Sequence, residues 1–331
     1  MKRVIVICPY FGKLPNYFDL WLTSASYNND FQFVILTDDR EEFSVPENVR
    51  ILRMSFDELR QLFQKKFDFS ISLEEPYKLC DYKPTFAYCF NELLDLSKYS
   101  FWGHFDLDVI WGDLKKFLPT NSMEEYGKIN HAAHLSLYRN DKMINEAFMR
   151  SICKLNYKDI LSSPVHFAFD EIGEYGINAI LQSMGERIYN YENNVARIAP
   201  LKSNLVVGMG YDHENNKTTS YDYRPRVFSF NNGQLFDYSL EEEIIKKKEW
   251  AYIHLQKRRM AIKTMKDDKE FLICPHSFEK SREITPHFIR DCQERKFYPR
   301  YFSIKYGAGR RKIRRLLEIK RIKRIKTIKT K

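Results

Sequence analysis

The sequence FWGHFDLDVIWGDL, residues 101–114, contains an apolar and aromatic run that ends in two aspartates, Asp106 and Asp108. The residues before Asp106 are typical of a strand buried on both faces of a sheet. The pair is therefore expected at the carboxyl end of that strand, where open α/β sheets bind ligands. A buried carboxylate costs roughly several kcal/mol unless it is paired, and a divalent cation carrying a phosphorylated substrate satisfies that need. The stretch thus predicts metal-assisted chemistry on a phosphorylated substrate.

A simpler explanation of the two aspartates is local. A D-x-D pattern is expected by chance about once in a chain of this length and composition. Asp106 or Asp108 would then cap the short helix that begins near Asp113, or both would lie in a solvated turn. A cap needs only one aspartate, so the second one favours a ligand site.

The charge of the chain is unevenly distributed. Of 331 residues, 44% are hydrophobic and 15% aromatic, which is typical of a globular protein. The formal net charge is +10, but residues 310–331 carry twelve Lys or Arg and one Glu, and the preceding 309 residues carry 42 basic and 43 acidic side chains. The body is therefore nearly neutral, and we expect no specific nucleic-acid binding by it.

The cysteines and apolar runs predict the compartment. The six cysteines contain no C-x-x-C pair, which favours reduced thiols over a disulfide framework or a structural zinc site. The apolar run near the N-terminus is only five residues long, too short for a signal peptide, and no stretch approaches the roughly 18 residues that span a bilayer. We expect a cytoplasmic protein.

The pattern of elements predicts an α/β fold. Strand signals at 4–8, 31–36, 49–54 and 101–108 alternate with helix signals at 15–28, at 55–67, which opens with a Ser-x-x-Glu capping box, and from about residue 84. The pattern of strands and helices is less regular in the second half. It has a strand at 134–139, helices at 141–152 and 169–185, and short strands at 226–230, 250–255 and 271–275. We expect one domain over residues 1–300, with a mostly parallel central sheet flanked by helices, followed by a basic tail over 301–331.

Polar and aromatic clusters follow the first two predicted strands. Tyr10 and Phe11 precede Gly12, which permits a turn where a nucleotide can approach the backbone. Thr37, Asp38 and Asp39 end the second strand and are suited to a base or a ribose. Each cluster is also compatible with a simple turn or helix cap.

Two further clusters lie near the D-x-D strand and late in the chain. Lys78, Asp81 and Lys83 open the helix before that strand, where the lysines suit a diphosphate and Asp81 a sugar hydroxyl; the alternative is an ordinary solvated helix start. His254 ends an apolar strand just before Lys257 and two arginines. A lone histidine is usually structural, but this one is a candidate third metal ligand.

Taken in order, the motifs PYFG, TDD, YKLCDYKP, FWGHFDLD, HLSLYRN, FDE and YIHLQKR resemble those of a bacterial family. This family comprises the GT-A-fold glycosyltransferases found with capsule and lipopolysaccharide genes, and the resemblance extends over roughly residues 1–280. It implies a GT-A-like (Rossmann-like) fold and a hexosyltransferase-type enzyme. Such an enzyme uses Mn²⁺ or Mg²⁺, a nucleotide-diphosphate sugar such as a UDP-sugar, and a glycan or lipid-linked acceptor.

The resemblance also implies roles for individual residues. Asp106 would lie near the ribose and the metal, Asp108 and His254 would ligate the metal, and Lys257 would lie near the diphosphate. Asp170 and Glu171, in HFAFDEIG, match a position for an acceptor-binding or base carboxylate, or they cap the following helix. With such a base the reaction inverts the anomeric centre, and without one retention is favoured.

Other classes of protein remain as alternatives. A non-catalytic sugar-nucleotide-binding protein would use the same groups without turnover. A nucleic-acid-binding protein would account for the basic tail, and its binding would survive loss of Asp106 and Asp108. A metal-dependent phosphohydrolase is a further alternative, although it more often has a denser Asp/His cluster for two metals.

The tail, RRKIRRLLEIKRIKRIKTIKTK, spaces apolar residues about three apart among cations. These are Ile313, Leu316, Leu317, Ile319, Ile322, Ile325 and Ile328. The pattern predicts a basic amphipathic helix on an anionic membrane surface, where each nearby Lys or Arg contributes about 1 kcal/mol. Residues 310–331 would then hold the protein peripherally on the inner face of the cell membrane; the alternative is a disordered basic tail.

Overall fold

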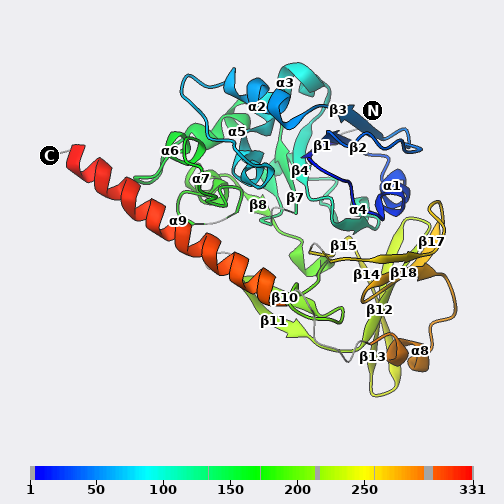
Figure 1. Cartoon of the computed structure of the whole chain (residues 1–331). Coiled ribbons are helices and arrows are strands. Elements are labelled where there is room, and N and C mark those ends of the chain that lie inside the picture. Colours follow the sequence, from blue (N-terminus) through cyan, green and yellow to red (C-terminus); the bar gives the residue numbers. More distant parts are fainter. Residues whose placement is uncertain are drawn as a thin grey trace.

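In the computed structural model of the chain (Figure 1), most of the first half of the sequence builds one seven-stranded sheet. The structure describes residues 4–132, 134–171, 173–212, 217–256, 258–293 and 301–329. The sheet has the strand order β3-β2-β1-β4-β7-β6-β8. Its strands are β1 (Val4–Pro9), β2 (Phe31–Thr37), β3 (Val49–Arg53), β4 (Phe101–Phe105), β6 (Lys128–Ile129), β7 (Leu135–Arg139) and β8 (Ile188–Tyr189).

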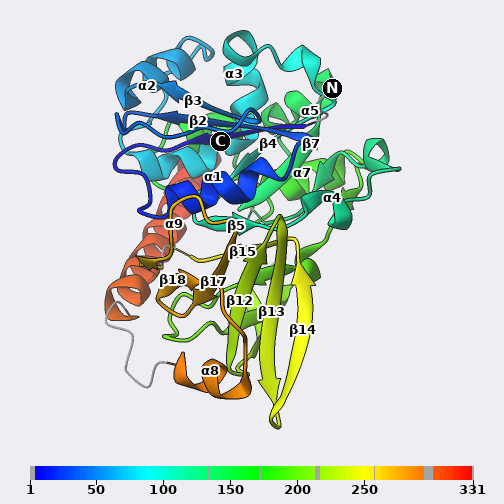
Figure 2. The same cartoon turned by 90° about the vertical axis from the view of Figure 1, so that its right-hand side faces the viewer.

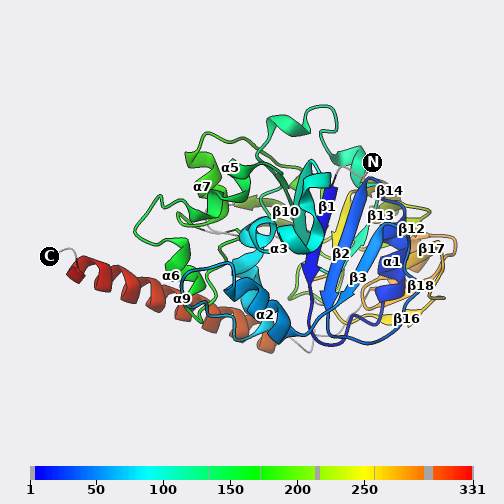
Figure 3. The same cartoon turned by 90° about the horizontal axis from the view of Figure 1, so that it is seen from above.

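The first four of these strands run parallel, and Figure 3 shows β1, β2 and β3 side by side. The strand β7 pairs antiparallel with β4. At Gly103 in β4 the two backbones lie so close that an added Cβ would meet the Ser136 carbonyl oxygen at 2.2 Å. The glycine is therefore required by close packing of β4 against β7.

Helices cover both faces of this sheet because successive side chains of a strand point to opposite faces. Val4, Val6 and Cys8 of β1 pack in the core beside α1 (Phe18–Ser26). Ile5 and Ile7 pack in the other core, with α2 (Phe56–Gln64) and α3 (Phe86–Leu94). Figure 2 shows α2 and α3 above the sheet and α1 below it.

Most strands of the second half form smaller sheets. A six-stranded sheet has the order β14-β13-β12-β17-β18-β16 and lies below α1 in Figure 2. Its strands are β12 (Arg226–Asn231), β13 (Gln234–Glu241), β14 (Ile244–Trp250), β16 (Ala261–Lys263), β17 (Glu270–Cys274) and β18 (Ser277–Lys280). Tyr17 meets Phe278 and Tyr27 meets Phe230, so this sheet shares the α1 core.

A three-stranded sheet connects the two halves. It has the order β5-β15-β9, with β5 (Val109–Trp111), β9 (Val195–Arg197) and β15 (Tyr252–His254). In the register of β15 and β5, His254 lies opposite Val109, one residue after Asp108. A separate hairpin pairs β10 (Val207–Asp212) with β11 (Lys217–Asp222).

The remaining helices are short, except for the last one. They are η1 (Pro76–Thr85), η2 (Leu96–Lys98), α4 (Leu114–Phe117), η3 (Met123–Glu125), α5 (Lys142–Asn145), η4 (Ala147–Met149), α6 (Tyr157–Leu161), α7 (Ile177–Ser183), η5 (Glu192–Asn194), α8 (Pro286–Asp291) and α9 (Tyr301–Lys329). Among the described residues, no helix combines the length and the apolar character needed to cross a bilayer.

The structure confirms the mixed α/β class and every strand predicted in the first half, and also the Ser55–Glu58 capping box of α2. Two predicted helices are wrong in extent. The helix predicted over 169–185 is formed only as α7, and that over 141–152 is split into α5 and η4. The expectation of one central sheet is also too simple, since the chain forms three further sheets, to which the second half contributes every strand except β5.

Candidate metal site

The loop after β4 and the end of strand β15 bring together three side chains that could hold a metal ion. Asp106 and Asp108 follow β4, and His254 ends β15. One ligand atom from each side chain lies within 4.8 Å of the others. The His254 Nε2 atom lies 3.2 Å from Asp108 Oδ1. The structure therefore places the three residues predicted to ligate a metal in one group.

Backbone hydrogen bonds fix this arrangement. The Asp106 amide donates to the His134 carbonyl oxygen (3.0 Å), and the Leu255 amide donates to the Asp108 carbonyl oxygen (2.8 Å). The side chain that caps α4 is Asp113, which accepts from the Lys116 amide. The alternative that Asp106 or Asp108 caps this helix is therefore wrong.

Lys83 connects the group to a third carboxyl group, that of Asp170. Its Nζ atom lies 2.8 Å from Asp106 Oδ1 and 3.5 Å from Asp170 Oδ2. Burial opposes the charge of Lys83, but the carboxylates of Asp106 and Asp170 still raise its pKa well above the ordinary value. Burial raises the pKa of Asp170, Lys83 lowers it, and neighbouring acids raise it further. The structure thus adds Asp170 to the cluster.

The donor set fits a divalent cation. Carboxylate oxygens and an imidazole suit Mn²⁺, and carboxylates suit Mg²⁺. Asp106, Asp108 and Asp170 offer three carboxyl groups against the single ammonium of Lys83. The His254 Nδ1 atom is buried and has no hydrogen-bond partner among the described residues. A bound cation would supply positive charge that this cluster lacks.

His134 is a neighbour of the group for which the sequence analysis predicted no role. Its ring lies 4.6 Å from that of His254 between centroids, and its Nδ1 atom lies 2.6 Å from the Tyr252 hydroxyl. Burial first, and then His254, lower the pKa of His134 well below the ordinary value. The His134 ring is therefore neutral, and it packs against the His254 ring. The motif HLSLYRN contained this histidine, but only the fold places it behind His254.

Lys78 and Asp81 form a buried pair. Their side chains are 2% and 0% exposed, and the Lys78 Nζ atom lies 2.7 Å from Asp81 Oδ2. Lys78 also donates to the Ile160 and Val165 carbonyl oxygens. These contacts do not support the expected binding of diphosphate by Lys78 or of sugar by Asp81.

Asp81 instead holds the loop that precedes Asp170. It accepts hydrogen bonds from the Phe167 and Phe169 amides at 2.9 to 3.1 Å. Between them, Ala168 has a φ of 58°, a conformation that costs energy for a residue with a Cβ. Asp81 is therefore a positioning residue for Asp170.

Asp170 and Glu171 do not cap the next helix, because Gly176 is the N-cap of α7. The carboxyl group of Asp170 is almost fully buried and faces Lys83. The Glu171 backbone is held on both sides, since its amide donates to Ala168 and its carbonyl accepts from Asn178. An ion pair with Lys83 joins Asp170 to the group of Asp106, Asp108 and His254.

Hydrogen bonds join the residue cluster after β1 to the one after β2. The Gly12 amide donates to Asp38 (2.7 Å), and the Leu14 amide donates to Asp39 (2.8 Å). The Thr37 hydroxyl accepts from the Asp39 amide, as in the turn that was the alternative prediction. These acids shape the loop after β1.

The two aromatic residues of that loop differ in surroundings. The pKa of Tyr10 is raised first by burial, and then by the charges of Cys8 and Asp108. The ring of Phe11 packs on Phe56, with centroids 5.2 Å apart. Lys257, the remaining predicted site residue, lies outside the described residues.

Residues 6–282 of the chain match the family described as "Family of unknown function (DUF6625)". The chain belongs to this family. The DUF6625 region contains the whole cluster of Lys83, Asp106, Asp108, Asp170 and His254, whereas α8 and α9 lie beyond its end. A search among curated proteins finds no match.

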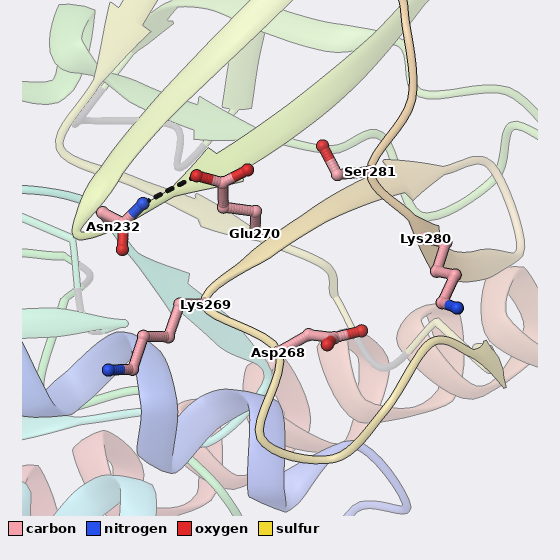
Figure 4. A pocket seen from close by; sticks show the side chains of 6 residues that line it. All are labelled: Asn232, Asp268, Lys269, Glu270, Lys280 and Ser281. Atoms are coloured by element: carbon pink, nitrogen blue, oxygen red, sulfur yellow. Dashed lines mark hydrogen bonds between the residues drawn. The ribbon is translucent and has the colours of Figure 1, made fainter.

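The DUF6625 region also contains a shallow hollow, lined by residues of β17, of β18 and of the turns beside them (Figure 4). Asn232, Asp268, Lys269, Glu270, Lys280 and Ser281 line the hollow, and Asn232 donates a hydrogen bond of 2.8 Å to Glu270. The hollow is lined both by negatively charged carboxylates and by positively charged ammonium groups. It offers no convergent set of ligand-binding groups.

A buried lysine of the DUF6625 region makes stability depend on pH. Lys128 is 0% exposed, its Nζ atom lies 2.6 Å from Asn178 Oδ1, and burial lowers its pKa from 10.5 to about 7. The unfolded chain then binds this proton more tightly than the folded protein. The stability from neutral Lys128 is therefore full above pH 10.5 and is lost as the pH falls through about 7.

We expect this dependence to disappear in Lys128→Met. The free energy of unfolding of the wild type relative to the variant should rise by up to about 1.4 kcal/mol per pH unit between about pH 7 and pH 10. Urea unfolding of both proteins across this range measures the difference. The exposed Lys142→Met controls for replacing a lysine. A difference that stays constant or falls with pH would contradict the assignment.

Proposed function

We propose that the protein is a metal-dependent glycosyltransferase that moves a sugar from a nucleotide-diphosphate sugar to a glycan or lipid-linked acceptor. The observation that carries this proposal is the group of Asp106, Asp108 and His254, whose ligand atoms lie within 4.8 Å of one another. The two aspartates lie at the carboxyl end of β4, which runs parallel to its neighbour β1. Ligands bind at this edge in α/β proteins.

The same arrangement supports a GT-A-like fold. The parallel order β3-β2-β1-β4, followed by the antiparallel β7, gives a sheet with one ligand edge, and the D-x-D pair lies on it. The motifs quoted from the sequence follow this edge, since PYFG ends β1, TDD ends β2 and FWGHFDLD contains β4. Tyr10, which follows β1 on this edge, is the aromatic residue that we assign to the donor.

The residues divide into those that hold the donor and those that serve the acceptor. Asp106, Asp108 and His254 hold the divalent cation, which when bound offsets the negative charge that develops on the leaving diphosphate. Lys83, fixed between Asp106 and Asp170, adds a positive charge at the same place. We assign the donor site to these groups and not to the buried pair Lys78 and Asp81.

Asp170 is the candidate acceptor carboxylate. Its pKa is raised, first by burial, and a raised pKa makes a carboxylate a stronger base toward an acceptor hydroxyl. If it faces the acceptor hydroxyl on the side opposite the leaving group, it acts as a general base and the reaction inverts the anomeric centre. Without that geometry, attack from the same face gives retention.

The test is a thermal-shift screen of nucleotide-diphosphate sugars with and without Mn²⁺, followed by turnover of each compound that binds. We expect at least one compound to raise the melting temperature only when Mn²⁺ is present, because the diphosphate and the cation bind together. Stabilisation without turnover on any acceptor would instead indicate a sugar-nucleotide-binding protein.

Other outcomes would refute the proposal in favour of different chemistry. Mn²⁺-dependent release of phosphate from a phosphomonoester, without sugar transfer, would indicate a phosphohydrolase. Salt-sensitive nucleic-acid binding that persists in Asp106→Asn and Asp108→Asn, with no response to any nucleotide sugar, would indicate the nucleic-acid alternative.

A further inference from the structure

The helix α9 has two different faces. Arg315, Glu318, Ile319, Ile322, Lys323 and Lys326 recur at helical spacing, and all are at least partly buried. Ile322 belongs to the core that covers the α3 face of the central sheet, and Ile319 packs against it. Figure 1 shows the helix running along one side of the molecule, beside α6 and α7. The inner face is therefore occupied by the protein itself.

Polar contacts reinforce this docking. Ser163 donates to Glu318 (3.1 Å), Lys323 pairs with Glu174 (2.9 Å), and Lys326 pairs with Asp159. These partners all belong to the segment of 159–174, which includes Asp170. The helix is thus a docked element with a fixed orientation, and Figure 3 shows its C-terminal end projecting beyond the body.

The outer face exposes large apolar side chains. Tyr306, Ile313 and Leu317 are 68%, 60% and 62% exposed, and Leu316 beside them is 49% exposed. Spacings of seven and four residues place Tyr306, Ile313 and Leu317 along one stripe, opposite Ile322. An apolar stripe exposed to this extent marks a surface that contacts another molecule or a membrane.

Cations surround this stripe. They are Arg310, Lys312, Arg314, Lys320 and Arg324, all exposed. Glu318, the one acid from residue 310 onward, points inward and pairs with Arg321. Within the described part of α9, the five cations therefore have no acidic side chain of their own helix to neutralise them.

We propose that the outer face of α9 binds an anionic lipid bilayer, with Tyr306, Ile313, Leu316 and Leu317 entering the interface. The cations around the stripe meet the anionic headgroups, while the apolar side chains enter the acyl boundary. A nucleic acid would use the cations and leave the leucines in water. A second copy of the chain would bring the nearly neutral body or another cationic helix to this face.

The docking of α9 also sets where a membrane would lie relative to the metal site. Arg311 packs over the Tyr77 ring, 5.0 Å from its centroid, and Arg315 donates to the Phe167 carbonyl oxygen. Tyr77 is near enough to Asp170 and Asp106 for both to add to the rise that burial causes in its pKa, to about 12. Tyr77 lies in η1 (Pro76–Thr85) with Lys83, and Phe167 lies in the 167–170 loop with Asp170, so α9 contacts both segments that carry this part of the cluster. A bilayer bound to the outer face would lie on the far side of α9 from these segments, which serve a lipid-linked acceptor if the proposed function holds.

The experiment measures binding of the full chain to vesicles by cosedimentation. Vesicles of phosphatidylcholine mixed with phosphatidylglycerol are compared with vesicles of phosphatidylcholine alone. We expect binding only to the anionic vesicles, weakened by added salt because the headgroup attraction is screened. No glycosyl transfer is measured, so failure here and failure of the proposed activity are distinguishable.

Three variants separate the contributions. Arg310→Gln/Lys320→Gln/Arg324→Gln should lower the partition coefficient roughly a hundredfold, at about fivefold for each cation. Ile313→Ser/Leu317→Ser removes two apolar side chains from the stripe, and its partition coefficient should fall at least about tenfold. The matched control, Lys65→Gln/Lys142→Gln/Lys246→Gln, removes the same charge at exposed sites elsewhere and should bind nearly as the wild type does.

Several results would overturn the proposal. These are absence of binding by the wild type, equal loss in the control variant, and unchanged binding by Ile313→Ser/Leu317→Ser. Sedimentation equilibrium without lipid provides a further check. A dimer that this apolar variant dissociates would assign the face to a second copy of the chain. Circular dichroism verifies that each variant keeps the wild-type helix content.

Discussion

Asp108→Asn is expected to reduce metal-dependent sugar transfer by more than about 100-fold, and Mn²⁺ affinity with it. Outer-sphere partners of a metal site alone change affinity by about 10- to 100-fold, so loss of a ligand charge should exceed that range. The fold should remain, because the substitution keeps the backbone hydrogen bond at this position. The carbonyl oxygen of residue 108 accepts from the Leu255 amide, and asparagine has the same carbonyl group as aspartate. Calorimetric titration with Mn²⁺ tests the metal assignment before any donor is known.

Asp113→Asn is a matched control for this substitution. Asp113 lies five positions later and caps α4, a role that asparagine performs about as well as aspartate. It therefore removes the same charge from the same region without touching the cluster. Normal Mn²⁺ affinity and turnover in Asp108→Asn, or equal losses in both variants, would refute the metal assignment.

Asp81→Ala is expected to lower the free energy of unfolding by about 3–5 kcal/mol, the cost of breaking a buried ion pair. The substitution leaves Lys78, which is 2% exposed, without its carboxylate. It also removes the acceptor of the Phe167 and Phe169 amides, which shape the loop before Asp170. Urea unfolding measures the loss.

Two further variants separate the cost of leaving a buried charge unpaired from the cost of replacing any paired aspartate by alanine. In Asp68→Ala, the lost pair is with Lys158 at the surface, and Asp68 is 79% exposed, so the cost should stay below about 1 kcal/mol. Adding Lys78→Met to Asp81→Ala removes the unpaired charge and should restore part of the stability. Equal losses in Asp81→Ala and Asp68→Ala would show that Asp81 is not the buried partner.

Local patterns predicted the first half of the fold well. The strands β1, β2 and β4 are short apolar runs whose side chains are buried on both faces, as expected for inner strands of a sheet that is covered on both sides. The edge strand β3 differs, since Arg50 and Arg53 are exposed. The helix at 169–185 failed because its first residues, Phe169 and Asp170, are held by Asp81 and Lys83 in a loop. Those tertiary contacts outweigh a weak local preference for helix.

The second half was harder to predict because its sheets depend on pairings between distant residues. The strand β14, IIKKKEW, has an exposed lysine run that does not alternate as a half-buried strand does. It forms through its register with β13, in which Lys247 lies opposite Tyr238. Cross-strand pairing of this kind is not visible in a sequence window.

The sequence by itself determined the α/β class, the carboxyl-end position of Asp106 and Asp108, and the basic, apolar pattern of the tail. It did so because strand burial and helical spacing are local properties. Only the tertiary structure separated Lys83, which joins Asp106 to Asp170, from Lys78, which pairs with Asp81 inside the protein. It also placed His134 behind His254 and divided α9 into a docked face and an exposed one. These distinctions depend on which residues meet across the fold, and the spacing of residues along the chain does not fix that.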